Sequence, residues 1–231
     1  MSSVEEAQSR WPASLSRPLL VLLGCLAPWV AWSYPRVWGT DRFFNEIRLV
    51  ALGACAGEGV LWPDWLPSLA HGHGYPLFHF YPAGLYLAAS PFQALGLSPR
   101  AALLVVLTLG LIAGALGVHG LLRSRVGERL ACLGGVLWLS APYLYVNLLV
   151  RHAWAELLAL SLLPLALWGV MDLAQGRGGR GAMVRAIVGV TLILLVHNIV
   201  ALFAAGAALL VAVFAWRAQG DLAAPGRIAR A

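Results

Sequence analysis

Long apolar runs separated by short polar connections make up most of this chain. A helix needs about 20 apolar residues to cross a bilayer, and the runs 101–122, 130–150 and 153–173 have that length. A shorter run, 18–33, comes before them, and a longer one, 184–216, comes after them. The pattern predicts an all-α, polytopic integral membrane protein with about five or six transmembrane helices and a large external first loop.

Two segments do not fit a simple crossing. The run 184–216 is too long for one ordinary span and tight for two, and His197 and Asn198 interrupt it in the middle. Polar groups inside an apolar run usually mark a site or a packed polar contact, and one helix and a hairpin both remain open. The segment 83–97 is short and is broken by Pro91, so we expect it to be re-entrant or to lie at the membrane surface.

Clustered arginines give the chain an expected orientation. Two short connections are rich in arginine: Arg123, Arg125 and Arg129 in the first, and Arg177, Arg180 and Arg185 in the second. The positive-inside bias places both in the cytoplasm, together with tails 1–17 and 217–231. The loop 35–82 then lies outside. We expect a multi-pass protein of the inner (plasma) membrane, with one transmembrane domain over 18–216 and a cytoplasmic N-terminus.

The first apolar run has a second interpretation. A basic flank followed by a short apolar core is also typical of a cleaved signal peptide. No small-x-small cleavage site follows residues 18–33, however, and Trp29 and Trp32 suit an interfacial belt. We therefore favour an uncleaved first transmembrane helix.

Composition agrees with a membrane protein and limits the classes of partner that we expect. The chain is 60% hydrophobic and 11% charged, with a mean hydropathy of +0.78, whereas soluble domains carry about 25% charged residues. All 16 basic residues are arginines dispersed between apolar runs, so despite a pI near 9.8 we expect membrane lipids and no nucleic acid as partners. The cysteines Cys25, Cys55 and Cys132 form no CxxC pair, which argues against a disulfide framework or a zinc site.

The polar chemistry is concentrated in the first loop, where charged residues alternate with tryptophan and tyrosine as in an interfacial segment. Asp41, Asn45 and Arg48 are spaced i, i+4 and i+7, so they share one face if the segment is helical. Asp41 could act there as a base or as a metal ligand. The alternative is that Thr40 or Asp41 caps the helix and that Arg42 pairs with Glu46.

Two further groups carry candidate chemistry. The motif RHAWAE places His152 four residues before Glu156 with Arg151 beside it, and a structural salt link is the competing interpretation. The histidines of HGHGYPLFH, residues 71–79, look like metal ligands. Their peptide is flexible and lacks a carboxylate at fixed spacing, so we do not predict a specific metal site there.

The order of these motifs resembles that of a known group of bacterial membrane proteins, those with the 6-pyruvoyl-tetrahydropterin-synthase-related domain. The motifs are GTDRFFNEIR, WPDWLPSLAHGHGYPLFHFYPAGLY, SAPYLYVNLLVRHAWAE and LLVHNIVALF. The layout over 18–216 is also similar to the GT-C superfamily, polytopic glycosyltransferases that use lipid-phosphate-linked sugars and carry an acidic residue in the first external loop. The resemblance implies that Asp41 matches that acidic position and that Arg151 and Glu156 match a polar pair on the same face.

The chain departs from that layout in two ways. Asn45 stands where relatives often have histidine shortly after the acidic residue, which weakens a metal or proton-transfer role at that position. Relatives are also usually several times longer, so a fragment or a short form is an open interpretation.

These observations predict a GT-C-like glycosyltransferase that takes a sugar from a polyprenyl-phosphate donor at the external membrane face. The expected catalytic residues are Asp41 and Glu156. The expected substrate-binding residues are Arg48, Arg151, His152, Tyr75, Tyr81, His197 and Asn198. The cofactor is left open, with a divalent metal as one option. The alternative is a non-catalytic membrane scaffold or accessory subunit. A transporter is less favoured, because no internal repeat is visible.

Overall fold

The computed structural model describes residues 12–28, 33 and 41–223. Within these residues the chain is helical and forms no strand, apart from one isolated bridge between Leu66 and Tyr75. The predicted all-α polytopic architecture is therefore confirmed.

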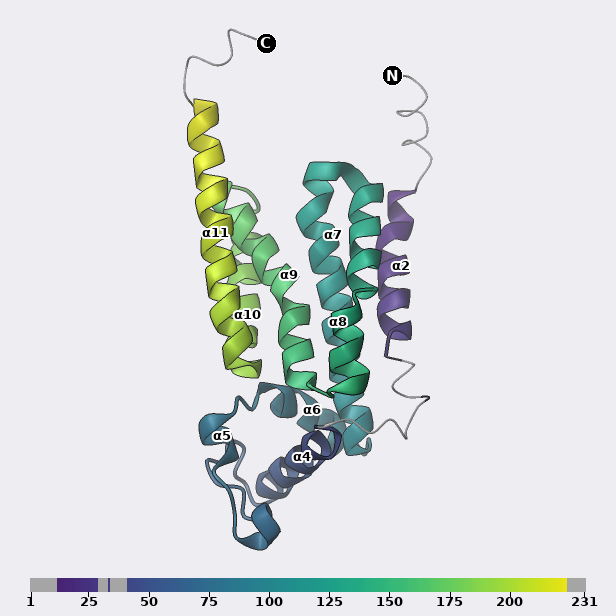
Figure 1. Ribbon diagram of the computed structural model, residues 1–231, viewed down its shortest axis with the longest axis vertical. Helices are drawn as coiled ribbons and strands as arrows, with labels where there is room; N and C mark the ends of the chain where they lie inside the picture. The colour runs from purple at the N-terminus through teal and green to yellow at the C-terminus, as the bar shows by residue number, and fades with distance from the viewer. Residues whose placement is uncertain (1–11, 29–32, 34–40, 224–231) are drawn as a thin grey trace.

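The long apolar helices run side by side in a bundle (Figure 1). They are α2 (Ala13–Leu26), α7 (Pro99–Leu139), α9 (Trp154–Ala174), α10 (Gly179–Val196) and α11 (Asn198–Ala223). Four segments are long and apolar enough to cross a bilayer, namely 99–150, 154–174, 179–196 and 198–215, and α2 is a shorter apolar helix. The structure thus splits the run 184–216 at His197 into a helical hairpin.

The segment 99–150 makes two passes because α7 reverses direction at Gly127 (Figure 1). Gly127 has φ 80° and ψ 172°, a combination that a residue with a Cβ atom rarely adopts. The second pass continues through α8 (Pro142–Tyr145) and a π-helical turn, Val146–Val150. With α9, α10 and α11, the described residues contain five passes that are long and apolar enough to cross a bilayer, and the shorter α2 packs beside them.

Helix α2 begins at Ala13, five residues before the apolar run that predicted it. Its polar first turns pack against the second half of α7, where the Cys132 thiol lies 4.0 Å from the Ser16 carbonyl oxygen. Further along, a Cβ atom on Gly135 would lie 2.8 Å from the Leu20 side chain. Close packing against α7 therefore extends the helix beyond what local hydrophobicity indicates.

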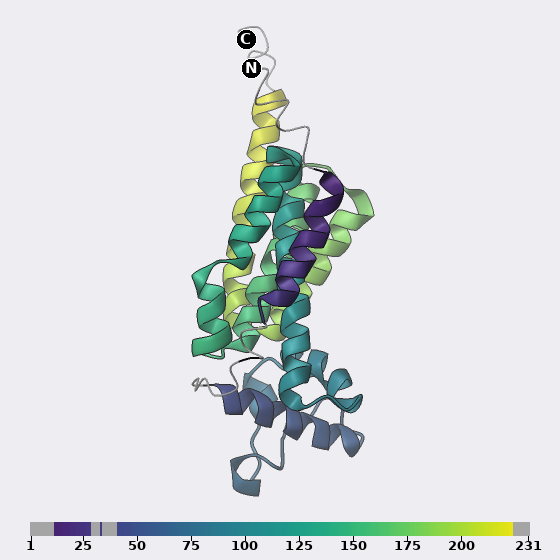
Figure 2. The same cartoon turned by 90° about the vertical axis from the view of Figure 1, so that its right-hand side faces the viewer.

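A second layer lies across one end of the bundle (Figures 1 and 2). It consists of α4 (Arg42–Gly57), η1 (Ala70–Gly72), α5 (Leu77–Phe80) and α6 (Gly84–Ala94). Ala51, Cys55, Leu66 and Leu77 form a small core of their own inside it. Trp62, Trp65 and Phe80 are exposed on this layer, as expected for a segment at the membrane surface.

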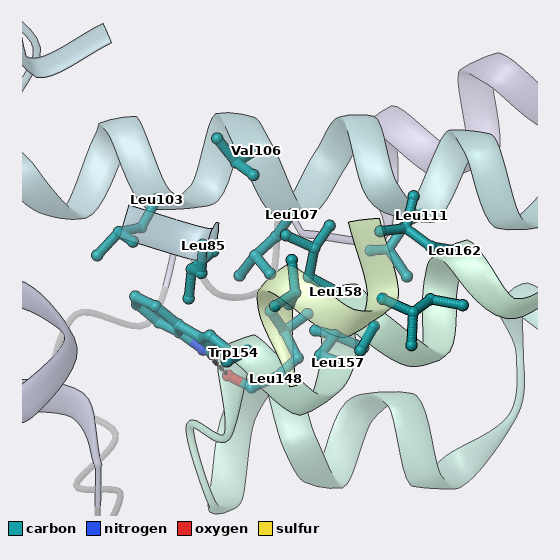
Figure 3. Close-up of a cluster of buried hydrophobic side chains, with 14 of the residues drawn as sticks. Leu85, Leu103, Val106, Leu107, Leu111, Leu148, Trp154, Leu157, Leu158 and Leu162 are labelled. Atoms are coloured by element: carbon teal, nitrogen blue, oxygen red, sulfur yellow. Dashed lines mark hydrogen bonds between the residues drawn. The ribbon is translucent and has the colours of Figure 1, made fainter. Parts of the chain in front are cut away.

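Helix α6 joins this layer to the bundle. Figure 3 shows Leu85 of α6 among the buried leucines of α7 and α9, with Trp154 beside it. The indole nitrogen of Trp154 donates a hydrogen bond to the Leu148 carbonyl oxygen at 3.1 Å. At 11 residues α6 is too short to cross a bilayer, and its buried face fixes the position of the polar groups described next.

The two ends of the bundle carry different elements (Figure 1). One end carries the start of α2, the reversal at Gly127, the connection between α9 and α10, and the end of α11. The other carries the α4–α6 layer, the junction between α8 and α9, and the break at His197. The structure groups the connections as arginine placement predicts. Which end of the bundle faces the cytoplasm stays a prediction.

Candidate functional site

The polar face of α4 connects three parts of the chain. The Tyr86 hydroxyl donates to Asn45 Oδ1 at 2.9 Å and accepts from Arg48 Nη1 at 3.1 Å. Asn45 Nδ2 donates to the His152 carbonyl oxygen at 2.7 Å. Asn45 and Arg48 therefore share a helix face, as their spacing predicts, and they tie α4 to α6 and to the start of α9.

Aromatic rings hold the guanidinium group of Arg48 in place. Its central carbon lies 4.7 Å from the centroid of the Tyr81 ring and 5.7 Å from that of Phe44. Both distances fall within the range of cation–π attraction. Burial raises the pKa of Tyr81 and of Tyr86, so both hydroxyls stay neutral at physiological pH. Arg48 is thus a fixed positive charge beside neutral hydroxyl groups.

Asp41 lies at the start of α4, where two elements meet. Its backbone N–H donates to the Arg151 carbonyl oxygen at 3.3 Å, and its own carbonyl accepts from Asn45 N at 3.0 Å. The Asp41 side chain makes no capping hydrogen bond to α4, contrary to the capping alternative for this residue. Its carboxylate also adds to the rise in the pKa of Tyr81, second to burial among the raising effects. Asp41 therefore groups with Asn45, Arg48, Tyr81 and Tyr86, which we call together the Arg48 cluster.

The other two proposed partners of that alternative, Thr40 and the Arg42 side chain, lie outside the described residues.

A second polar group surrounds Glu156 at the start of α9. Arg151 Nη2 lies 3.0 Å from Glu156 Oε2, and the Tyr143 hydroxyl donates to Oε1 at 2.5 Å. Asn147 Nδ2 donates to the same oxygen at 3.4 Å, and Asn147 Oδ1 accepts from Arg151 Nη1 at 2.7 Å. The Glu156 carboxylate is occupied from several sides, which matches the structural salt link better than a free catalytic base.

The connection that carries these groups is strained. His152 has φ 52°, in the left-handed region that residues with a Cβ atom avoid, at a cost of about 1–3 kcal/mol. It is buried, and it directly follows the π-helical turn Val146–Val150 and Arg151. Such turns are frequent at functional sites. The strained backbone aims the His152 carbonyl at Asn45 and so joins the two polar groups.

His197 and Asn198 form the turn of the α10–α11 hairpin. His197 Nδ1 accepts from the Val200 N–H at 3.2 Å, and Asn198 Oδ1 accepts from the Ile199 N–H at 2.9 Å. Burial lowers the pKa of His197, while the charge of Glu156 acts in the opposite direction. Both side chains satisfy the backbone at the start of α11, and His197 also faces the Glu156 group.

Two cavities lie in this part of the molecule, and Arg48 lines one of them. The first, about 540 Å³, lies between α4 and the loop before α5 and is lined by Arg48, His71 and Tyr75 among others. The second is an apolar groove of about 590 Å³ between α6, α7, α9 and α10, which runs from Gly84 and Val196 past Leu109 and Leu192. The polar cavity is therefore lined by α4 and the loop that follows it, and the apolar groove by α6 and the bundle.

The histidines of 71–79 do not assemble a metal site in the structure. No group of three His, Cys, Asp or Glu side chains suited to a metal ion occurs among the residues that the structure describes. His71 lines the polar cavity instead, and the His79 ring packs edge-on against Phe80.

Sequence reasoning missed three residues of the site: Tyr86, Tyr143 and Asn147. Tyr86 carries a hydroxyl within the apolar stretch 84–89, and this is a usable signal because a buried hydroxyl needs a partner. Asn147 is a fully buried amide in an apolar segment and gave the same signal. Nothing in the local sequence distinguishes Tyr143 from an ordinary interfacial tyrosine.

Comparison with known proteins identifies the family. The model of the 6-pyruvoyl-tetrahydropterin synthase related domain, a membrane protein family, matches residues 78–222. No curated protein and no solved structure matches the chain significantly. The matched region includes Tyr86, Arg151 and Glu156, whereas α4 precedes it. Since the match covers more than half of the chain, this protein belongs to the membrane protein family with the 6-pyruvoyl-tetrahydropterin synthase related domain.

Proposed function

We propose that this protein transfers a sugar from a polyprenyl-phosphate donor to an acceptor at the membrane face covered by α4 and α6. The observation that carries the proposal is the apolar groove between α6, α7, α9 and α10, because α6 also carries Tyr86, the hydrogen-bond partner of Arg48. A lipid-linked donor needs this combination, because its tail must stay in apolar surroundings while its phosphate meets positive charge.

The groove lies on the side of the bundle. Leu109, Leu192 and Leu195 line it and are exposed, so a lipid chain in the bilayer has direct access to it. At its end, a Cβ atom on Gly84 would lie 2.4 Å from the Leu195 carbonyl oxygen, so α6 abuts the last turn of α10. Gly84 precedes Tyr86 by only two residues. Tyr86 lies on the opposite face of α6 and is buried, so a headgroup at Gly84 would extend around the start of α6 to reach Arg48.

Arg48 is the cation best placed for the donor phosphate. It is held between aromatic rings and donates to a neutral hydroxyl. Among the described residues, no carboxylate lies within ion-pair distance of it. Arg151 also faces this layer but already binds Glu156. A guanidinium group with free donors suits a phosphate. Arg48 would bind the phosphate, whereas Arg151 would stay paired with Glu156.

The reaction requires a base on the acceptor side, and Asp41 is the candidate. The acceptor oxygen would attack the anomeric carbon and form the new glycosidic bond. The bond from that carbon to the phosphate oxygen would break, and its electron pair would leave with the polyprenyl phosphate. Asp41 would take the acceptor proton. The cavity lined by Arg48, His71 and Tyr75 offers space for the acceptor.

The substitution Asp41→Asn tests the proposal. Loss of a general base should lower the transfer rate about 10²- to 10⁴-fold while leaving folding intact. Transfer is measured in membranes with a panel of polyprenyl-phosphate sugars, at equal protein level. Asp64→Asn is the matched control, because Asp64 is an exposed carboxylate of the same loop and lines neither cavity.

The outcomes separate the roles of the residues. Unchanged transfer by Asp41→Asn would remove Asp41 from the mechanism. Binding of a polyprenyl-phosphate analogue should weaken in Arg48→Ala, and unchanged binding would remove the donor site from this position.

A non-catalytic scaffold is the second candidate, and the Glu156 group favours it. Its carboxylate is occupied by Arg151, Tyr143 and Asn147, which leaves Asp41 as the one candidate base of the two expected catalytic residues. A scaffold would transfer no sugar from any donor. Absence of transfer by the unmodified chain across the whole panel would support this function.

A further inference from the structure

A third cavity lies at the opposite end of the bundle from the Arg48 cluster, between α2, α7 and α9. Its volume is about 600 Å³, and its polar lining consists mainly of Arg17, His119, Arg123, Ser124, Asp172 and Arg177. The indole of Trp168 forms part of the wall and approaches Gly120 so closely that a Cβ atom there would lie 2.5 Å from the ring. The cavity volume falls in the range of small-molecule sites, roughly 300–1,000 Å³.

The negative charge of Asp172 is neutralised by a residue outside the cavity lining. Arg185 Nη2 donates to Asp172 Oδ2 at 2.8 Å. The Arg185 guanidinium also stacks on Trp168, with its central carbon 4.0 Å from the ring centroid. Asp172 is therefore already paired and does not cancel the charges of the arginines that face the cavity.

Glu128 is similarly occupied. His119 Nε2 lies 2.9 Å from Glu128 Oε1, and Arg123 Nε lies 3.6 Å from Oε2. The His119 side chain is buried, so this contact is built into the packing of α7. The Arg123 contact uses Nε, which leaves the two terminal nitrogens of this guanidinium outside the ion pair.

The remaining two cations are the strongest sign of a ligand. Arg17 and Arg177 are exposed, and in the described part of the chain no carboxylate lies within ion-pair distance of either side chain. They come from α2 and from the connection after α9, and so approach the cavity from two elements. A pocket with one paired acid and three arginines attracts an anion that can accept several hydrogen bonds.

We propose that this cavity binds the phosphate-bearing headgroup of an anionic membrane lipid. Basic pockets between transmembrane helices hold such headgroups at the membrane interface. The cavity lies where α2 begins, α7 reverses and α9 ends, so a lipid can enter it while its tails stay beside the helices. Free phosphate shares the same recognition chemistry and is the alternative source of the anion. This site is independent of the proposed transfer reaction.

The test is lipid binding by purified protein in detergent, measured by native mass spectrometry and by the rise in unfolding temperature on adding lipid. Phosphatidylglycerol is compared with phosphatidylcholine and with inorganic phosphate. The double variant Arg17→Gln/Arg177→Gln should bind phosphatidylglycerol at least about tenfold more weakly, because two charge-assisted contacts are lost. Both residues are exposed, so the variant should fold like the unmodified protein.

The matched control is Arg180→Gln/Arg217→Gln. It removes the same charge from exposed positions at the same end of the bundle, and neither residue lines the cavity. Its phosphatidylglycerol affinity should equal that of the unmodified protein. An equal loss in both double variants would reduce the effect to general surface charge and overturn the proposal. Equal binding of phosphatidylglycerol and phosphatidylcholine, or phosphate binding without any lipid preference, would overturn the lipid assignment.

Discussion

At the scale of single residues, Tyr86 connects the site to the core. Its side chain is fully buried, with the ring centroid 5.7 Å from that of Phe78 and 6.4 Å from that of Tyr81. Its hydroxyl forms hydrogen bonds with both Asn45 and Arg48. The orientation of the α4 polar face therefore depends on this hydroxyl group.

The variant Tyr86→Phe should be less stable by about 1–3 kcal/mol. The ring would keep its packing, while the Asn45 oxygen and an Arg48 nitrogen would lose their shared partner in a place with little water. Thermal unfolding in detergent measures the change. Tyr75→Phe is the control, since Tyr75 is 48% exposed and water can replace its hydroxyl contacts. Equal unfolding temperatures for both variants would show that the Tyr86 hydroxyl does not stabilise the fold.

At the scale of helices, close backbone contact fixes the packing of α9 against α10. A Cβ atom on Gly169 would lie 2.3 Å from the Ala186 backbone nitrogen and 2.8 Å from the Ala182 carbonyl oxygen. A Cβ atom on Gly189 would likewise lie 2.8 Å from the Ala166 Cα atom. Small residues at such contacts are the usual means of packing helices in a membrane, where helix association lacks a hydrophobic driving force.

The substitution Gly169→Ala should therefore destabilise the bundle by about 1–3 kcal/mol, since the contacting atoms are backbone and cannot turn aside. Gly206→Ala on α11 is the matched control, because a Cβ atom there meets no atom within 4 Å. The control should keep or slightly raise the unfolding temperature. If both variants unfold at the same temperature as the unmodified protein, α9 and α10 are not packed as closely as the structure shows.

At the scale of the whole molecule, the protein is a bundle with two chemically different ends. The α4–α6 layer, the Glu156 group and the His197 turn gather at one end, and the arginine-rich reversals gather at the other (Figures 1 and 2). An apolar groove lies on the side of the bundle near the first end, and the basic cavity lies at the second. Each proposed site is therefore confined to one membrane surface.

This arrangement predicts the outcome of cysteine labelling in a background without the native cysteines. In intact cells a membrane-impermeant reagent should label Glu58→Cys, which lies in the exposed part of the α4 layer. Ser124→Cys, beside Arg125, should react only after permeabilisation, because the positive-inside bias places that connection in the cytoplasm. Labelling of Ser124→Cys in intact cells would reverse the orientation and move the proposed transfer site to the cytoplasmic surface.

The sequence by itself determined the membrane class, most of the passes and their grouping. Span length is set by bilayer thickness, and hydrophobicity is a local property, so runs such as 101–122 can be read without knowledge of the fold. Arginine placement is equally local, and it sorted the connections onto the two ends that the structure displays. The spacing of Asn45 and Arg48 placed them on one face for the same reason.

Only the tertiary structure decided which polar groups meet. Tyr86 reaches Asn45 across 41 residues of chain, and Asn45 reaches His152 across 107, and no periodic pattern encodes such distances. Only the tertiary structure also shows that Arg151, Tyr143 and Asn147 all contact the Glu156 carboxylate. The hairpin at His197 and the reversal at Gly127 were also settled by packing, since a break in hydrophobicity or a single glycine fits several backbone paths.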